Sequence, residues 1–284
     1  MKKISFYKYS GAGNDFILID GHENSNFKIN TEEIVNLCTR RTGIGSDGIL
    51  HIQETEGYDY RLDFYNPDGS TGMLCANGAR CSIAHASAKG WIDSKNVRFI
   101  ANKREYSGVV LNKNLVRLNL LDPEGLELNK SVQIEGGYLS LHQINTGSPH
   151  VVVFLEELQK LGGSDYNDIN SLVQIPVSTM GAEIRSLKDF LPEGVNVNFV
   201  HVSGDTVLVR TFEKGVEAET LASGTGSTAS ALISHVVKGL EPPIRVSTFG
   251  GDYMEINFKK NDNVISDVSL TGPAKEIFKG EYII

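Results

Sequence analysis

The sequence predicts a mixed α/β fold of the α+β kind, made of two pseudo-symmetric lobes, each a curved, mainly antiparallel sheet wrapped around one central helix. Three observations lead to this prediction. The chain has 284 residues, about twice the ~150 residues of a typical single domain. Strand-like runs follow one another in the same order in both halves. Each half also contains one uncharged helical segment rich in small residues.

The first half alternates apolar and polar residues in short runs bounded by Gly, Asn, Asp or Pro, the pattern of half-buried strands. We predict strands over Ile4–Ser10, Phe16–Asp20, Ile49–Gln53, Tyr60–Tyr65, Val97–Ala101, Tyr106–Leu111 and Leu115–Leu120. A short helix should interrupt them, because Asn30 can cap a helix and Glu33 follows three residues later. That helix would run through Ile34, Leu37 and Cys38.

The tetrad Asp122-Pro-Glu-Gly breaks the strand pattern, and a second series of elements starts from Ser131. It comprises predicted strands over Gly137–Thr146, Val151–Leu155, Asn196–Val202, Thr206–Phe212, Arg245–Phe249 and Tyr253–Phe258, and helical stretches near Asp168–Val173 and Gly181–Phe190. We expect residues 1–120 and a returning strand in 268–284 to form one lobe, and residues 121–267 to form the other.

Short segments of the two halves correspond, which indicates an internal duplication. Tyr9-Ser-Gly-Ala-Gly13 lies between two predicted strands, and so does Asn145-Thr-Gly-Ser-Pro149. The run Arg61–Asn66 leads to Cys75-Ala-Asn-Gly-Ala-Arg80, just as Val207–Glu213 leads to Ser223-Gly-Thr-Gly-Ser-Thr228. Two homologous lobes are the simplest explanation.

The helical segments that follow, Cys81–Lys89 and Ala229–Lys238, carry no charge before their final Lys. A surface helix would show a charged face. Small side chains all round suit a helix enclosed by its own sheet, where the strands approach closely. Both segments are followed by Gly, a favourable helix C-terminus.

Composition and charge exclude several classes of protein. The net charge of -8 and the pI near 5.4 disfavour nucleic acids and anionic membranes as partners. No window approaches the ~20 apolar residues of a membrane-spanning helix. The three cysteines, Cys38, Cys75 and Cys81, form neither a disulfide framework nor a CxxC zinc motif. We therefore expect a cytoplasmic protein without a metal.

Cys75 and Ser223 stand at the heads of the two central helices. Helix N-termini bind carboxylates and lower the pKa of a Cys placed there. If the lobes face each other, the two helix ends meet in one cleft, with a substrate carboxylate held by both. A proton could then be removed from one face of the α-carbon and delivered to the other, which is racemisation without a cofactor.

Two other interpretations of these residues stay open. A lone Cys at a helix start is more often a small buried hydrophobe than a catalyst. Ser223-Gly-Thr-Gly-Ser would also suit a phosphate-binding turn, although it lacks the Lys of GxxxxGK[ST]. The duplication is what favours racemisation.

Nine ordered segments carry a family resemblance. They are Lys8–Phe16, Arg40–Gly48, Tyr65–Gly69, Cys75–Cys81, Ser148–His150, Gly194–Phe199, Glu213–Gly215, Glu219–Gly226 and Leu270–Ala274. With them the chain resembles, over essentially its whole length, the diaminopimelate epimerases, which are pyridoxal-independent amino-acid racemases. The resemblance implies an isomerase without cofactor or metal that converts LL-2,6-diaminopimelate to the meso isomer, supplying lysine and peptidoglycan synthesis.

The resemblance also implies roles for individual residues. Cys75 is one catalytic cysteine, and position 223 is the other catalytic position. The implied substrate-binding residues are Asn14, Asn66, Ala76, Asn77, Ser148, His150, Asn196, Glu213, Lys214, Gly224 and Thr225. Ala76, Asn77, Gly224 and Thr225 would cradle the reacting carboxylate, Glu213 and Lys214 would hold the distal end of the amino acid, and His150 would border the cleft.

Some of these residues also have an ordinary structural explanation. Asn66-Pro-Asp-Gly is a common turn sequence, and Asn14 could be a turn or cap residue. Glu213 beside Lys214 could be a solvated ion pair.

The chain departs from the family pattern at four positions. Ser223 stands where the family has its second Cys, Ala76 where it usually has Gly, Ser148 where it has Asn, and Lys214 where it has Arg. Ser148 and Lys214 would lie at the distal-recognition end, where an ammonium does not replace a bidentate guanidinium.

Two alternative functions therefore stay open. Ser148 and Lys214 favour a racemase of another amino acid, such as histidine or a basic amino acid. Ser223 favours a catalytically impaired amino-acid-binding relative. A small-molecule amino acid is the expected partner in each case, and a homodimer stays open.

Overall fold

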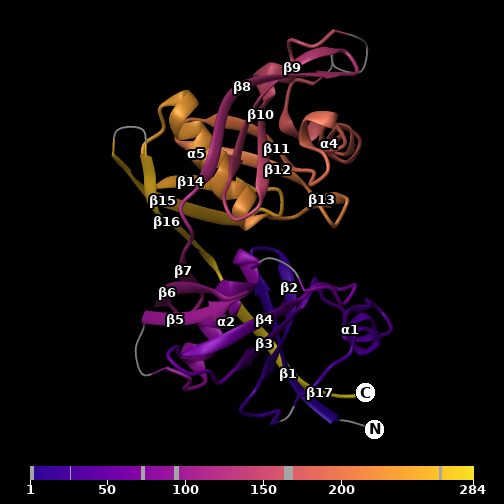
Figure 1. The fold of residues 1–284 in the computed structure, drawn as a ribbon, viewed down its shortest axis with the longest axis vertical. Coiled ribbons are helices and arrows are strands. Elements are labelled where there is room, and N and C mark those ends of the chain that lie inside the picture. The colour runs from indigo at the N-terminus through magenta and orange to yellow at the C-terminus, as the bar shows by residue number, and fades with distance from the viewer. Residues whose placement is uncertain (1–2, 26, 72–73, 93–95, 163–168, 262–263) are drawn as a thin grey trace. The chain divides into compact units, whose positions relative to one another are not determined.

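The computed structural model describes residues 3–25, 27–71, 74–92, 96–162, 169–261 and 264–284. They fold into two compact units (Figure 1). Unit 1 is formed by residues 1–119 and 271–284, and unit 2 by residues 120–270. The boundaries expected from the sequence were 120 and 268.

The described residues of unit 1 form a mixed sheet and two helices. Its elements are β1 (Lys3–Gly11), β2 (Asn14–Asp20), α1 (Thr31–Cys38), β3 (Ile49–Gln53), β4 (Tyr60–Tyr65), α2 (Ala76–Ala88), β5 (Asn96–Ala101), β6 (Arg104–Asn112), β7 (Leu115–Asn119) and β17 (Lys275–Ile283). The pairs β1–β2, β3–β4, β5–β6 and β6–β7 are antiparallel, whereas β2–β3 and β4–β5 are parallel. All seven strands predicted from the first half are present.

Helix α1 begins with the predicted capping box. The backbone N–H of Glu33 donates to Asn30 Oδ1 at 2.9 Å, and the backbone N–H of Asn30 donates to Glu33 Oε2 at 2.9 Å. Two backbone groups that the helix cannot pair are satisfied in this way. Ile34, Leu37 and Cys38 form the buried face, as predicted.

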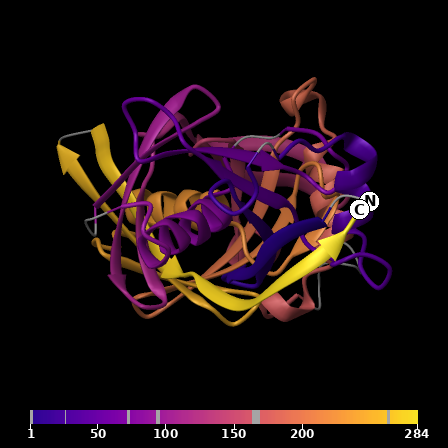
Figure 2. The same cartoon turned by 90° about the horizontal axis from the view of Figure 1, so that it is seen from below.

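The C-terminal strand β17 returns to unit 1 and pairs antiparallel with β1. In Figure 2 the yellow strand runs beside the indigo one. Ile4 pairs with Tyr282, and Lys3 pairs with Ile283. The sequence predicted one returning strand, but the structure has two strands in this segment. Strand β16 (Val264–Pro273) begins in unit 2 and ends in unit 1, and β17 lies in unit 1.

Unit 2 repeats the arrangement of unit 1. Its elements are β8 (Glu124–Ile134), β9 (Gly137–Asn145), β10 (Pro149–Phe154), α3 (Leu155–Leu158), η1 (Leu172–Gln174), α4 (Val177–Arg185), η2 (Lys188–Phe190), β11 (Asn196–Ser203), β12 (Thr206–Glu213), β13 (Ala218–Thr220), α5 (Gly224–Lys238), β14 (Ile244–Thr248) and β15 (Tyr253–Asn261). The pairs β9–β10, β11–β12 and β14–β15 are antiparallel, and β10–β11 and β12–β14 are parallel. This alternation matches β1 to β6, as a duplicated unit requires.

Each sheet surrounds one buried helix. Helix α2 packs against β1, β2, β3, β6, β7 and β17, and α5 packs against β9 to β12, β14 and β15. Close approach depends on small residues. A Cβ on Gly108 of β6 would lie 2.5 Å from Ile83 Cδ1 of α2. The predicted architecture of a curved sheet around a central helix is confirmed in both units.

The central helices begin earlier than expected. The expected helical segments were Cys81–Lys89 and Ala229–Lys238, but α2 starts at Ala76 and α5 at Gly224, directly after Cys75 and Ser223. Helix α2 is also not free of charge, because it includes Arg80, which is fully buried.

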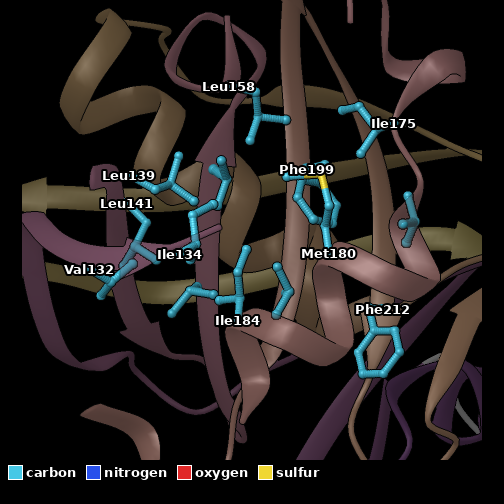
Figure 3. Close-up of a cluster of buried hydrophobic side chains, with 14 of the residues drawn as sticks. Val132, Ile134, Leu139, Leu141, Leu158, Ile175, Met180, Ile184, Phe199 and Phe212 are labelled. Atoms are coloured by element: carbon cyan, nitrogen blue, oxygen red, sulfur yellow. The ribbon is translucent and has the colours of Figure 1, made fainter. Parts of the chain in front are cut away.

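One hydrophobic cluster of unit 2 lies between its sheet and α4 (Figure 3). Phe199 of β11 and Phe212 of β12 pack in one cluster with Met180 and Ile184 of α4. A Cβ on Gly181 would lie 2.4 Å from the Phe212 side chain, so α4 contacts the sheet through its glycine. This contact fixes the strands that carry several candidate site residues.

Several expectations for unit 2 were wrong. The chain leaves the strand pattern between β7 and β8, at residues 120–123, but the second series of elements starts at Glu124 and not at Ser131. The first positions of β8 are exposed, so no alternation marks this strand. The helix expected near Asp168–Val173 is a 3-10 turn at Leu172–Gln174 where described, and Asp168 lies outside the described residues. The helix expected over Gly181–Phe190 begins at Val177 and stops at Arg185. Among the described helices, none is long and apolar enough to cross a membrane.

Candidate active site

Cys75 heads the central helix of unit 1. It is the N-cap of α2, with extended torsion angles (φ -78°, ψ 112°), and its side chain makes no capping hydrogen bond. The first turn of α2 contains no acidic residue, so its backbone N–H groups and the helix dipole place partial positive charge beside the thiol. This environment favours a thiolate and can bind a carboxylate. The predicted cradle residues Ala76 and Asn77 open the helix and are buried.

The other two thiols lie in a different environment. Cys38 on α1 and Cys81 in the middle of α2 are both buried, whereas Cys75 is half-buried. Burial raises the pKa of the Cys38 thiol, and it raises the pKa of Cys81 to about 12. Both therefore stay protonated and inert near neutral pH.

Asn14 and Asn77, both predicted to bind substrate, are brought together. Asn77 Nδ2 donates a hydrogen bond to Asn14 Oδ1 at 2.6 Å. Their approach needs Gly11 at the end of β1, where a Cβ would lie 2.8 Å from the carbonyl oxygen of Asn77. Two amide side chains therefore lie beside the helix end that carries Cys75.

Asn66 does not join this pair through its described hydrogen bonds. Its Nδ2 donates to Ser70 Oγ at 2.9 Å, and its carbonyl accepts from Gly69 N at 2.9 Å. The turn expected for Asn66-Pro-Asp-Gly is thus present. A substrate contact by Asn66 stays a prediction.

Ser223 heads the central helix of unit 2, and here the side chain does cap the helix. The backbone N–H of Gly226 donates to Ser223 Oγ at 3.2 Å. Gly224 and Thr225 are the first residues of α5. A Cβ at Gly226 would lie 2.4 Å from Asn198 Oδ1, so only glycine fits this turn against β11. Both predicted catalytic positions are helix N-caps.

His150 is fully buried beside the first turn of α5. Its Nε2 lies 2.9 Å from Ser148 Oγ and 2.9 Å from Thr225 Oγ1. Asn198 Nδ2 donates to Val151 O at 2.9 Å, which fixes the amide so that Nδ2 also donates to His150 Nδ1 at 3.1 Å. Nδ1 is therefore an acceptor, and the proton sits on Nε2.

The charge state of His150 follows from its surroundings. Burial, with a smaller contribution from the positive charge of Lys214, lowers the pKa of His150 to about 3. The imidazole is neutral at pH 7, and both ring nitrogens are engaged by residues other than Ser223. His150 thus donates from Nε2 to Thr225 or Ser148 and does not act as a base on the Ser223 hydroxyl.

The remaining predicted residues of unit 2 meet at the end of β11. Asn196 Oδ1 accepts from the backbone N–H of Lys214 at 2.9 Å, and Asn196 Nδ2 donates to Pro149 O at 2.9 Å and lies 3.3 Å from Ser148 Oγ. Lys214 Nζ donates to Glu193 O at 3.1 Å. Glu213 Oε2 accepts from the Thr220 hydroxyl at 3.1 Å. Ser148 Oγ also lies 3.4 Å from Thr225 Oγ1, so Ser148 is next to the first turn of α5.

Sequence reasoning overlooked three polar residues that support the candidate site. They are Asp47, which holds Asn14; Arg80, which holds Asn77; and Asn198, which holds His150. Each lies within a segment that carried the family resemblance, and this was the available signal. No group of three or more His, Cys, Asp or Glu side chains suited to a metal ion occurs in the part of the chain that the structure describes.

Solved structures share the fold at low sequence identity. The chain is similar to a Bacillus anthracis phenazine biosynthesis protein of the PhzF family, with a TM-score of 0.71, 13% identity and 100% of each chain covered. It is also similar to a probable proline racemase from Agrobacterium radiobacter K84, with a TM-score of 0.70, 13% identity, and 99% and 93% of the two chains covered. At this identity the likeness concerns the fold alone.

Sequence relatives are much closer. The diaminopimelate epimerase of Chlorobaculum tepidum is 36% identical over 274 residues, covering 95% of this chain and 98% of the relative. That of Aquifex aeolicus is 36% identical over 294 residues, covering 98% and 97%. The family model described as diaminopimelate epimerase matches residues 6–112 and 142–277. With both lobes matched and both helix ends included, the chain belongs to the diaminopimelate epimerase family.

Proposed function

We propose that this protein is an isomerase that interconverts LL-2,6-diaminopimelate and its meso isomer by moving the proton at one α-carbon. The observation that carries the proposal is the position of Cys75, a half-buried thiol at the N-cap of a helix whose first turn carries no acidic residue. Family membership supplies the substrate class. The reaction would serve lysine synthesis in the cytoplasm.

The geometry of α2 suits proton abstraction. An α-proton of an amino acid is very weakly acidic, so the base must be active at neutral pH and the developing negative charge must be stabilised. The helix N-terminus favours the thiolate of Cys75 as that base. The same N–H groups would receive the substrate carboxylate and stabilise charge that spreads into it during proton transfer.

Substrate recognition would use the other predicted residues. The proposed substrate-binding residues of unit 1 are Asn14, Asn66, Ala76 and Asn77, and those of unit 2 are Ser148, His150, Asn196, Glu213, Lys214, Gly224 and Thr225. Neutral His150 would serve as a hydrogen-bond donor that holds the Thr225 hydroxyl, because Nε2 carries its proton. Lys214 would present a single ammonium to the distal carboxylate.

Position 223 limits the rate of this chemistry. A two-base epimerase needs one deprotonated and one protonated group at neutral pH, and a thiol titrating near ~8.5 can serve in either state. A serine hydroxyl is far less acidic, and here its oxygen accepts from Gly226 N. We therefore propose that the chain binds diaminopimelate and exchanges the α-proton that Cys75 reaches, but inverts the centre slowly.

The test is proton exchange in deuterated water with LL-diaminopimelate, meso-diaminopimelate and single amino acids, followed by NMR and mass spectrometry. We expect deuterium at an α-position of diaminopimelate only. Cys75→Ala should reduce the exchange at least about 100-fold. Cys38→Ala, a matched control at a buried thiol, should leave it unchanged.

Each other outcome points to a different function. Exchange of histidine or of a basic amino acid in place of diaminopimelate would identify a racemase of that amino acid, as Ser148 and Lys214 allow. Binding without exchange would identify an amino-acid-binding relative. Exchange that survives Cys75→Ala would contradict the thiolate mechanism.

A further inference from the structure

Four side chains of unit 1 form one continuous hydrogen-bonded chain. Arg80 Nη2 donates to Asn77 Oδ1 at 2.8 Å, and Asn77 Nδ2 donates to Asn14 Oδ1 at 2.6 Å. Asn14 Nδ2 in turn donates to Asp47 Oδ2 at 3.1 Å. A cation, two amides and a carboxylate are thus joined in series.

The two ends determine the direction of every bond in this chain. A guanidinium can only donate, and a carboxylate can only accept. Asn77 must therefore turn its oxygen toward Arg80 and its NH₂ group toward Asn14, and Asn14 must turn its NH₂ group toward Asp47. Rotating either amide by 180° would place donor against donor or acceptor against acceptor at two contacts.

Both ends are themselves held firmly. The Arg80 side chain is fully buried on α2, and its Nη1 donates to Ala76 O at 3.2 Å. It lies against Gly272 of β16, where a Cβ would be 3.1 Å from Arg80 Nε. A buried cation with so little room cannot change rotamer to follow a rotated amide.

The carboxylate end is held by charge. Arg40 Nη2 lies 2.7 Å from Asp47 Oδ1, and the backbone N–H of Asp15 donates to Asp47 Oδ2 at 3.0 Å. The carboxylate of Asp15 is paired with Lys8 at 2.6 Å and also accepts from Arg40. Asp47 therefore keeps its orientation and stays available as an acceptor for Asn14.

We infer that Arg80 and Asp47 are positioning residues that fix how Asn14 and Asn77 present their amide groups to the amino-acid substrate. This inference rests on the proposed function, in which both asparagines bind substrate. An amide offers two N–H groups and two lone pairs. At Asn14 the hydrogen-bonded chain uses one N–H group and one lone pair of the amide. The other N–H group and the other lone pair are left for a ligand, in fixed directions. A polar substrate bound by such groups loses both affinity and alignment when the amides rotate.

Asp47→Asn is the decisive variant, because Asp47 is partly exposed and the side chain keeps its size. The new amide has one oxygen to share among Arg40, Asp15 N and Asn14, so its NH₂ group must face at least one donor. Asp63→Asn is the matched control. Asp63 Oδ2 likewise accepts from an amide and a guanidinium, those of Gln53 at 2.5 Å and Arg61 at 3.0 Å.

Two measurements separate positioning from a general structural role. The first is the dissociation constant of diaminopimelate by calorimetry, together with the rate of α-proton exchange. For Asp47→Asn we expect kcat/KM to fall at least about tenfold relative to Asp63→Asn. The second is the side-chain NH₂ signals of Asn-labelled protein. Those of Asn77 should shift in Asp47→Asn although Asn77 does not bond to Asp47, and they should stay in place in Asp63→Asn.

Arg80→Lys provides a second test from the other end of the chain. It keeps the buried charge but removes the planar pair of donors, so the Asn14 signals should shift although Asn14 does not bond to Arg80. If kcat/KM of Asp47→Asn stays within threefold of Asp63→Asn, or if only the directly bonded asparagine responds in each variant, the inference is overturned. If the unmodified chain neither binds nor exchanges diaminopimelate, the proposed function fails and the positioning role falls with it.

Discussion

The hydroxyl of Ser223 accepts a hydrogen bond from the backbone N–H of Gly226 at 3.2 Å. The corresponding residue of the other lobe, Cys75, makes no such capping bond, although it occupies the same N-cap position. The two duplicated helices therefore differ in how their first residues are capped. Ser223 caps its helix through its side chain, whereas the Cys75 side chain makes no capping hydrogen bond.

Ser223→Cys should trade stability for activity. A thiol at this position can act as the second acid or base, so turnover should rise by a factor of about 10²–10⁴. The same change removes a good N-cap and should lower the free energy of unfolding by about 1 kcal/mol. Turnover can be followed as interconversion of the diaminopimelate isomers, and stability by urea unfolding.

Ser223→Ala is the control for this experiment. It loses the same capping bond without supplying a thiol, so it should show a similar loss of stability and no gain in rate. If the unmodified chain already interconverts the isomers as fast as Ser223→Cys, two thiols are not needed and the assignment of position 223 is wrong.

Cys75 should be the thiol that reacts first with iodoacetamide. Its helix N-terminus favours the thiolate, while burial raises the pKa of Cys38 and Cys81. Peptide mass mapping over time should show Cys75 labelled well before the other two, with diaminopimelate slowing the reaction. Equal labelling of the three thiols would argue against a catalytic Cys75.

Local sequence patterns predicted most of the fold. Ile49–Gln53 and Tyr60–Tyr65 are strands with the expected bounds, because alternation between turn residues is a signal contained in the strand itself. Strand β8 was missed because its first six residues are exposed and its order comes from pairing with β9. Its partner, and not its own pattern, makes Glu124–Ile134 a strand.

The candidate site was predictable to a smaller extent. Cys75 and Ser223 could be placed at helix heads because capping is local and repeated in both halves. The bond between Asn14 and Asn77 joins β2 to α2, so it depends on tertiary packing that no spacing in the sequence reveals. Arg80 lies just before the segment Cys81–Lys89 that was expected to carry no charge before its final Lys, and the structure places it in the same helix. Its buried guanidinium donates to Ala76 O and Asn77 Oδ1 of that helix.

Acid should destabilise unit 1 through His51. Burial lowers the pKa of His51 to about 4, against about 6.5 in the unfolded chain. Between these values the unfolded state binds a proton that the folded state does not, so the free energy of unfolding falls as the pH falls, by up to about 1.4 kcal/mol per pH unit.

His51→Gln removes this titrating group and should flatten that dependence. The single Trp of the chain, Trp91, lies in unit 1, so urea unfolding followed by its fluorescence at pH 7 and pH 5 measures the relevant unit. If the free energy of unfolding falls by the same amount from pH 7 to pH 5 in the parent and in His51→Gln, His51 does not cause the pH dependence.

Gly108→Ala should destabilise unit 1 by about 1–3 kcal/mol, because the added methyl group has no room. Its Cβ would lie 2.5 Å from Ile83 Cδ1 of α2 and 2.7 Å from the backbone carbonyl oxygen of Arg117 on the neighbouring strand. The Ile83 methyl can turn away, but the carbonyl cannot move without disturbing the β6–β7 pairing. Trp91 fluorescence during urea unfolding gives the change in stability.

The double variant Ile83→Val/Gly108→Ala should lose less free energy of unfolding than the sum of the losses of the two single variants, because Ile83→Val removes one of the two close contacts. Strict additivity, or a Gly108→Ala protein as stable as the parent, would mean that the sheet does not depend on glycine to close around its central helix.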